Sequence, residues 1–153
     1  MQHPSAGVTS PLEATLSESP KLALLVQSGS HNRLHAMVSL TSTAVAMGGE
    51  VHIFLTHEAL KAYLTGTLDE AAPDFSDPEY QDFYQEAVEL ERTPNLSELL
   101  EESCARGPVK IYGCQASIAL WRGYSTEALN KLEAIIGHTT FLKIATGKQL
   151  LFL

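Results

Sequence analysis

Short, uninterrupted apolar segments that alternate with helical periodicity constrain the fold of this chain more than any other feature. The first such segment, residues 22–26, ends in a polar Ser-Gly-Ser turn, and from His31 onward apolar side chains recur at helical spacing as far as residues 48–49. A short continuous apolar segment is typical of a strand covered on both faces. Ser30 is placed to cap the helix that follows, and the glycine pair at 48–49 is placed to end it.

The same alternation continues along the chain. Further strands are expected at residues 51–56, 109–113, 132–136 and 149–153, with helices at 57–64, 115–121 and 138–146. Strands that alternate with helices favour an α/β fold with a mostly parallel sheet, because parallel strands need a long crossover to connect them.

Length and composition limit the domain organisation. The chain has 153 residues, the usual size of one domain, and residues 1–20 are rich in Ser, Thr, Pro and Ala. A stretch with so few large apolar side chains cannot offset the entropy lost on ordering. We therefore expect a flexible N-terminal tail at 1–20 and a single α/β domain at 21–153.

An acidic segment interrupts the alternation between the second and third strands. Residues 66–102 hold twelve acidic residues and one basic residue, a local charge of −11 in a chain whose net charge is −8. The Asp-Pro pair at 77–78 is a helix start signal. We expect an acidic helical insertion at about residues 66–95 whose aromatic face packs on the body of the domain, with a subunit contact or a lid as the alternative. Three aromatic side chains share that face: Tyr80, Phe83 and Tyr84.

A second helix is expected directly after the insertion. Asn95 and Glu98 have the spacing of a capping box. Cys104 lies on the apolar side of this helix, so we expect its thiol to pack in the core.

Charge, hydropathy and cysteine content exclude several functional classes. An acidic chain is poorly suited to sequence-independent nucleic-acid binding, which needs clustered Lys and Arg. No apolar run approaches the roughly 18 residues of a membrane span. Two cysteines and no secretory signal pattern favour a reducing, cytoplasmic setting. The Ser-Gly-Ser-His segment at 28–31 lacks the further glycines and the lysine of a nucleotide loop, so no cofactor is expected.

Several chemically useful side chains are expected where strands end. The carboxyl ends of parallel strands meet at one edge of a sheet, which is where ligands bind in open α/β folds. Cys114 would end one strand and precede a helix, a position that favours the thiolate; the alternative is that Cys114 is a small buried apolar residue. The polar candidates that would support the thiolate are Ser28, Ser30, His31, His57 and His138.

A metal site is the second interpretation of these residues. His31, His57 and His138 together with Cys114 offer imidazole and thiolate ligands of the kind that zinc and iron prefer. Their spacing matches no known metal signature, so the thiolate interpretation is the main one.

Three segments together resemble the DsrE/DsrF-like (DsrE/F/H) sulfur-transfer family. They are residues 44–56, residues 109–113 followed by Cys114 and Ser117, and residues 137–142. The resemblance covers residues 21–153, and the acidic insertion is longer than a minimal member needs.

This resemblance implies a three-layer α/β/α sandwich with a mostly parallel five-stranded sheet, assembled into homo-oligomers such as trimers or hexamers. It also implies a sulfurtransferase or sulfur carrier in which Cys114 holds sulfane sulfur as a persulfide and relays it to a partner carrier protein. The alternative is a non-catalytic, oligomeric module of the same fold that binds a small ligand or a metal, or serves in assembly.

Overall fold

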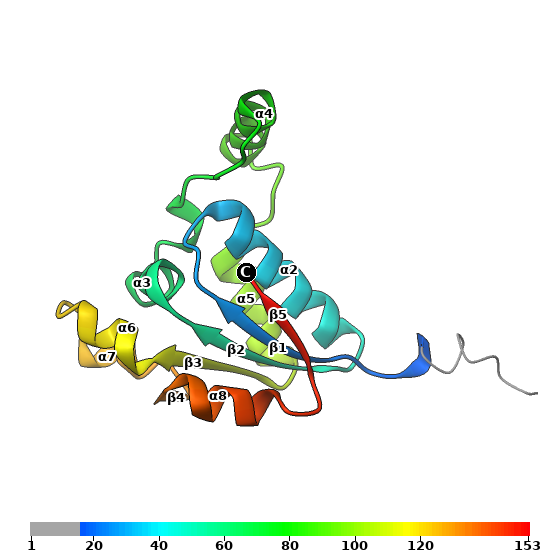
Figure 1. Ribbon diagram of the computed structural model, residues 1–153. Coiled ribbons are helices and arrows are strands. Elements are labelled where there is room, and N and C mark those ends of the chain that lie inside the picture. The colour runs from blue at the N-terminus through cyan, green and yellow to red at the C-terminus, as the bar shows by residue number, and fades with distance from the viewer. Residues whose placement is uncertain (1–15) are drawn as a thin grey trace, which may run out of the picture.

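The computed structural model describes residues 16–153 and contains one five-stranded parallel sheet (Figure 1). The strands are β1 (Lys21–Val26), β2 (Glu50–Leu55), β3 (Val109–Cys114), β4 (Ala134–Ile136) and β5 (Gln149–Phe152). They lie in the order β4-β3-β2-β1-β5, and every neighbouring pair is parallel. The predicted α/β sandwich is therefore confirmed. Most of the expected tail, residues 1–20, lies outside the described residues.

Helices connect the strands in the expected alternation. They are α2 (His31–Ala46), α3 (His57–Thr65), a single 3-10 turn η1 (Leu68–Glu70), α4 (Pro78–Glu89), α5 (Leu96–Arg106), α6 (Gln115–Leu120), α7 (Thr126–Leu129) and α8 (His138–Ala145). The two shortest, η1 and α7, were not predicted, because three or four residues are too few to show a helical period. No helix between residues 16 and 153 is long and apolar enough to cross a bilayer.

One face of the sheet carries the main core, under α2, α3 and α5. Alternate residues of each strand point to this face, as the two-residue period of a strand requires. In β1 these are Leu22, Leu24 and Val26, which are all buried. The helical spacing of Leu34 and Val38 in α2 places both side chains against them.

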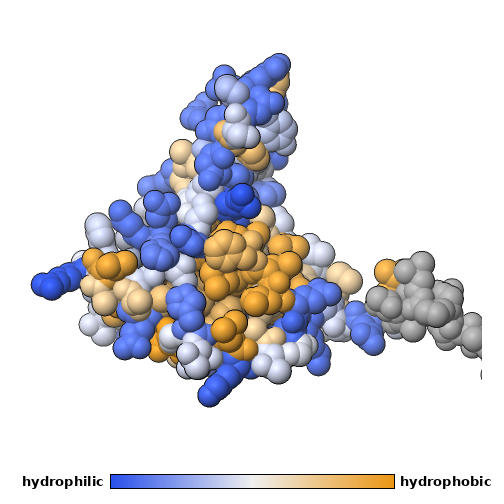
Figure 2. All heavy atoms as spheres, viewed as in Figure 1, coloured by the Kyte–Doolittle hydropathy of each residue, from blue (hydrophilic) through white to orange (hydrophobic). Residues whose placement is uncertain are grey.

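On the opposite face, α8 is the only helix among residues 16–153. Phe141 of α8 stacks on Phe54 of β2, with 4.8 Å between ring centroids, and both rings are fully buried. The short helix leaves the edge strand uncovered, so Leu150 and Phe152 of β5 are exposed. Figure 2 shows the resulting apolar area where Figure 1 places β5.

The acidic insertion forms a helix, but only one of its three aromatic side chains, Tyr84, packs on the body. Asp77 caps α4 by accepting hydrogen bonds from the backbone N–H groups of Glu79 and Tyr80, so the predicted start is confirmed. No residue of α4 is buried, and the helix projects from the sandwich (Figure 1). The prediction of a packed aromatic face is confirmed for Tyr84, whose ring meets that of His31 edge-on with 5.7 Å between centroids. It is wrong for Tyr80 and Phe83, which are exposed. Phe75, from the preceding loop, packs against Tyr80 and Tyr84.

Two phenylalanines provide a direct test of this arrangement. Phe54→Ala is expected to lower the free energy of unfolding by about 3–5 kcal/mol, because it removes a fully buried ring. Phe83→Ala is expected to change it by no more than about 0.5 kcal/mol, because this ring on α4 is 60% exposed. Urea denaturation measures both, and a large loss for Phe83→Ala would contradict the projecting helix.

Candidate functional site

The carboxyl ends of the strands do form one edge. The register pairs Val26 with Leu55, Leu55 with Gly113, and Cys114 with Ile136. Five of the six predicted site residues follow strand ends along the chain, and the sixth, Cys114, is itself the last residue of β3. They are nevertheless divided between the two faces of the sheet.

Cys114 occupies the predicted junction between a strand and a helix. It is the last residue of β3 and the N-cap residue of α6. Its side chain is on the α8 face, in an apolar cluster that includes Phe54, Tyr112 and Phe141. Only 2% of the residue is exposed, so the thiol is enclosed.

His31 lies on the other side of the sheet, at the start of α2. Its ring is buried, and Nδ1 lies 3.0 Å from the hydroxyl of Tyr84 in the acidic insertion. Burial lowers the pKa of His31, the nearby His35 lowers it further, and Asp69 opposes the shift. The His31 ring is therefore largely neutral at neutral pH, and it connects α4 to the body. It lies in the layer of α2, on the opposite side of the sheet from α8 and Cys114.

Ser28 and Ser30 bond to each other rather than to a helix end. Their hydroxyl oxygens are 2.9 Å apart, and the backbone N–H of Ser30 donates to Ser28 Oγ at 3.2 Å. Ser30 is the N-cap residue of α2, but its side chain makes no capping hydrogen bond. The predicted position of Ser30 at the start of α2 is confirmed. The predicted cap is wrong, because the Ser30 hydroxyl forms a hydrogen bond with the Ser28 hydroxyl instead.

His57 begins α3 with a positive φ of 45° and an exposed ring. Its backbone N–H donates to Ser117 Oγ at 2.9 Å, which joins the end of β2 to α6. The ring borders an open cleft of about 630 Å³ that also contains Ser28, Arg33 and Phe152. This cleft lies on the β5 side of the edge, and Cys114 does not line it.

His138 is the imidazole on the same side as Cys114. It begins α8, and its ring meets Phe54 edge-on with 5.1 Å between centroids. Phe54 belongs to the cluster that encloses the thiol. Within residues 16–153 no three His, Cys, Asp or Glu side chains are grouped so as to hold a metal ion, so His31, His57, Cys114 and His138 do not form a metal centre in this arrangement.

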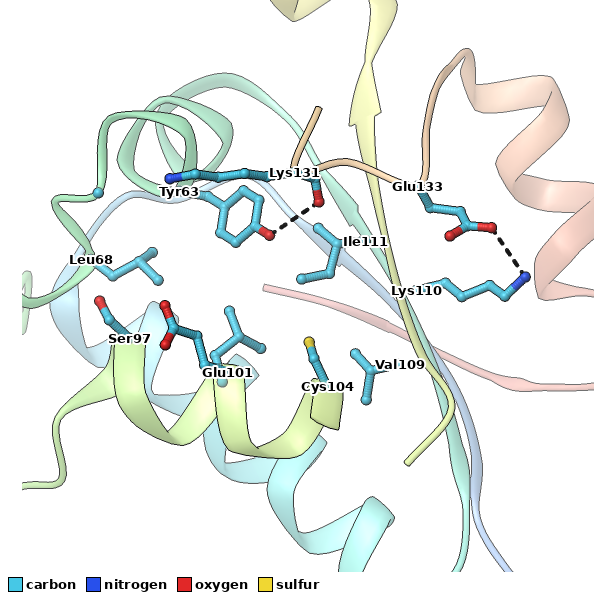
Figure 3. A pocket seen from close by; sticks show the side chains of 12 residues that line it. Tyr63, Leu68, Ser97, Glu101, Cys104, Val109, Lys110, Ile111, Lys131 and Glu133 are labelled. Atoms are coloured by element: carbon cyan, nitrogen blue, oxygen red, sulfur yellow. Dashed lines mark hydrogen bonds and ion pairs between the residues drawn. The ribbon is translucent and has the colours of Figure 1, made fainter. Parts of the chain in front are cut away.

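A cavity that the sequence did not indicate lies beside Cys104 (Figure 3). The prediction that this thiol packs in the core is wrong: Cys104 is exposed, and Ser103 is the buried neighbour. Ser103 tolerates burial because its hydroxyl donates to the Leu99 carbonyl at 2.7 Å. Adjacent residues of a helix differ by about 100° in direction, so burial of Ser103 turns Cys104 toward the cavity.

Two titratable groups of this cavity, the Cys104 thiol and the Tyr63 hydroxyl, are held in their neutral forms. Although Cys104 is exposed as a residue, the cavity walls partly bury its thiol and raise its pKa, and the carboxylate of Glu101 raises it further. Burial, Cys104 and Glu101 raise the pKa of Tyr63 to about 12. Cys104 is thus an accessible thiol with little thiolate at neutral pH.

Comparison with known proteins adds no relative. No protein-family model matches the chain, and a search of curated proteins finds no significant match. The expected DsrE/DsrF-like membership therefore stays a prediction.

The different environments of the two thiols predict different reactivity. Cys104 is expected to react with a chromogenic disulfide reagent at least about tenfold faster than Cys114, because an enclosed thiol reacts only through local opening. Cys104→Ser should remove the fast phase and Cys114→Ser the slow one. Equal rates in the folded protein would show that Cys114 is not enclosed.

The lowered pKa of His31 predicts a loss of stability in acid. The pKa of His31 in the folded state lies below its value of 6.5 in the unfolded state. The free energy of unfolding therefore keeps the full His31 contribution above about pH 6.5 and loses it as the pH falls toward the folded-state pKa. His31→Gln should reduce this loss of stability. Part of the loss should remain in the variant, because burial also lowers the pKa of His52. Unfolding free energies in urea at about pH 7.5 and about pH 5.5 measure the effect. His57→Gln, on an exposed ring, is the control, and an unchanged loss in His31→Gln would contradict the assignment.

Proposed function

We propose that the protein is a sulfur carrier that holds sulfane sulfur as a persulfide on Cys114 and relays it to the thiol of a partner protein. The observation that supports this proposal is the position of Cys114, which ends β3 at the carboxyl edge within an apolar cluster. Exclusion of water and of free thiols limits side reactions of a reactive intermediate. An enclosed persulfide would therefore persist until a partner reaches it.

The transfer is balanced without a cofactor. The Cys114 thiolate attacks the outer sulfur of a donor persulfide, forms a new S–S bond and releases the donor as a thiolate that takes up a proton. The acceptor thiolate then attacks the outer sulfur of the Cys114 persulfide, and Cys114 leaves as a thiolate. No net oxidation occurs in either step, because the sulfane sulfur only changes its carrier.

Access to Cys114 depends on α8 in this proposal. Phe141 and Phe54 close the cluster around the thiol, so docking of a donor or acceptor has to displace α8. His138, at the start of α8, is then the best-placed supporting group. Ser28, Ser30 and His31 bond elsewhere, and the ring of His57 borders the separate cleft beside β5.

We also propose the partners, the assembly and the compartment of the protein. The partners are donor and acceptor carrier proteins. The chain forms a homo-oligomer such as a trimer or hexamer, in a reducing cytoplasmic compartment. Neither nucleic acid nor membrane is a partner in it.

A binding or assembly module is the second candidate. The exposed aromatic side chains of α4 favour it, because Phe83 is 60% exposed and Tyr80, although Phe75 packs on it, is 54% exposed. Large exposed apolar surfaces mark interaction sites. In this alternative Cys114 is a packing residue and no sulfur is carried.

Intact mass after incubation with a persulfide donor tests the proposal. Wild type and Cys104→Ser are expected to gain about 32 Da, one sulfur atom, and to lose it on reduction. Cys114→Ser should gain much less sulfur, and only on the accessible Cys104 thiol. An equal gain in Cys114→Ser, or no gain in any protein, would overturn the proposed relay and favour the second candidate.

A further inference from the structure

The cavity beside Cys104 has the size and lining of a small-molecule site. Its volume is about 620 Å³, within the range of roughly 300–1,000 Å³ typical of ligand pockets. It lies over the amino-terminal half of β3, away from the carboxyl edge that holds Cys114. Its apolar surface includes four side chains from three elements, η1, α5 and β3: Leu68, Leu100, Val109 and Ile111.

The one unpaired carboxylate of this cavity is that of Glu101. Figure 3 shows it on the same side of the cavity as Ser97 and Leu68. Glu101 makes no ion pair within the described residues, whereas the adjacent Glu102 pairs with Arg106 at 3.7 Å. The Glu101 charge reaches across the cavity, since it raises the pKa of both Cys104 and Tyr63.

Among the described residues, no positive group of the cavity forms an ion pair with Glu101. Lys110 pairs with Glu133 at 3.2 Å on the opposite side. The Lys131 side chain runs past the Tyr63 ring, with its ammonium directed away from Cys104 (Figure 3). Tyr63 itself is held in place, because its hydroxyl donates to the Lys131 carbonyl at 3.4 Å. The cavity therefore has an apolar interior, an aromatic wall and, at the end where the Lys131 ammonium also lies, a carboxylate that makes no ion pair within the described chain (Figure 3).

We propose that this cavity binds an apolar amine. The hydrocarbon body of the ligand packs on Leu68, Leu100 and Ile111, and its ammonium group lies between the Glu101 carboxylate and the face of the Tyr63 ring. A carboxylate provides the ion pair, and an aromatic face attracts a cation through its quadrupole. This site is independent of the Cys114 chemistry, because the cavity lies beside Cys104 and Cys114 does not line it. Binding of the amine involves no sulfur transfer.

Binding of two matched probes tests the proposal. 2-Phenylethylamine and 2-phenylethanol have the same hydrocarbon body, but only the amine is charged at neutral pH. Titrations followed by backbone amide NMR shifts should place both in the cavity, with shifts in α5 and β3. The amine should bind about fivefold more tightly, the size expected for a partly exposed ion pair.

Glu101→Gln and Glu102→Gln are the matched variants. The preference for the amine should disappear in Glu101→Gln and remain in Glu102→Gln, because only Glu101 lines the cavity. Both side chains are exposed, and the amide spectrum reports whether each variant is folded. Equal affinity for the two probes in wild type, a preference that survives in Glu101→Gln, or shifts that map elsewhere would each overturn the proposal. None of these outcomes bears on persulfide formation at Cys114.

Discussion

Burial of β1 on both faces is the interaction on which the rest of the structure depends. Leu22, Leu24 and Val26 face α2, while Ala23 faces α8, and all four are buried. A strand buried on both faces needs a partner on each side for its backbone groups, and β2 and β5 provide them. The parallel register that follows brings the ends of the strands to one edge, where the predicted site residues lie.

The two faces of the sheet are covered unequally, and this asymmetry decides the environment of Cys114. Three helices cover one face, whereas α8 is the only described helix on the other, where the Cys114 thiol points. Phe141 of α8 closes the cluster around this thiol together with side chains of the strands, among them Phe54 and Tyr112. In the proposed sulfur transfer, a partner therefore has to displace α8 to reach Cys114.

The two thiols of the chain have different environments, because their side chains point in different directions from their elements. Cys114 is enclosed at a strand end, whereas Cys104 faces a cavity because Ser103 takes the buried position on α5. The same protein thus has an apolar enclosure, where we propose a persulfide, and a cavity bordered by Glu101, where we propose an amine. The acidic insertion adds a third exposed surface, connected to the body through the bond between Tyr84 and His31.

The sequence by itself determined the five strands, their main helices and the start of α4 at Asp77, because these depend on local periodicity and capping. It also determined that Cys114 joins a strand to a helix. Only the tertiary structure decided which face each strand-end residue occupies, that Tyr80 and Phe83 stay exposed, and that Cys104 borders a cavity. These outcomes depend on contacts between segments distant in the chain, such as Phe54 with Phe141, which local patterns do not encode.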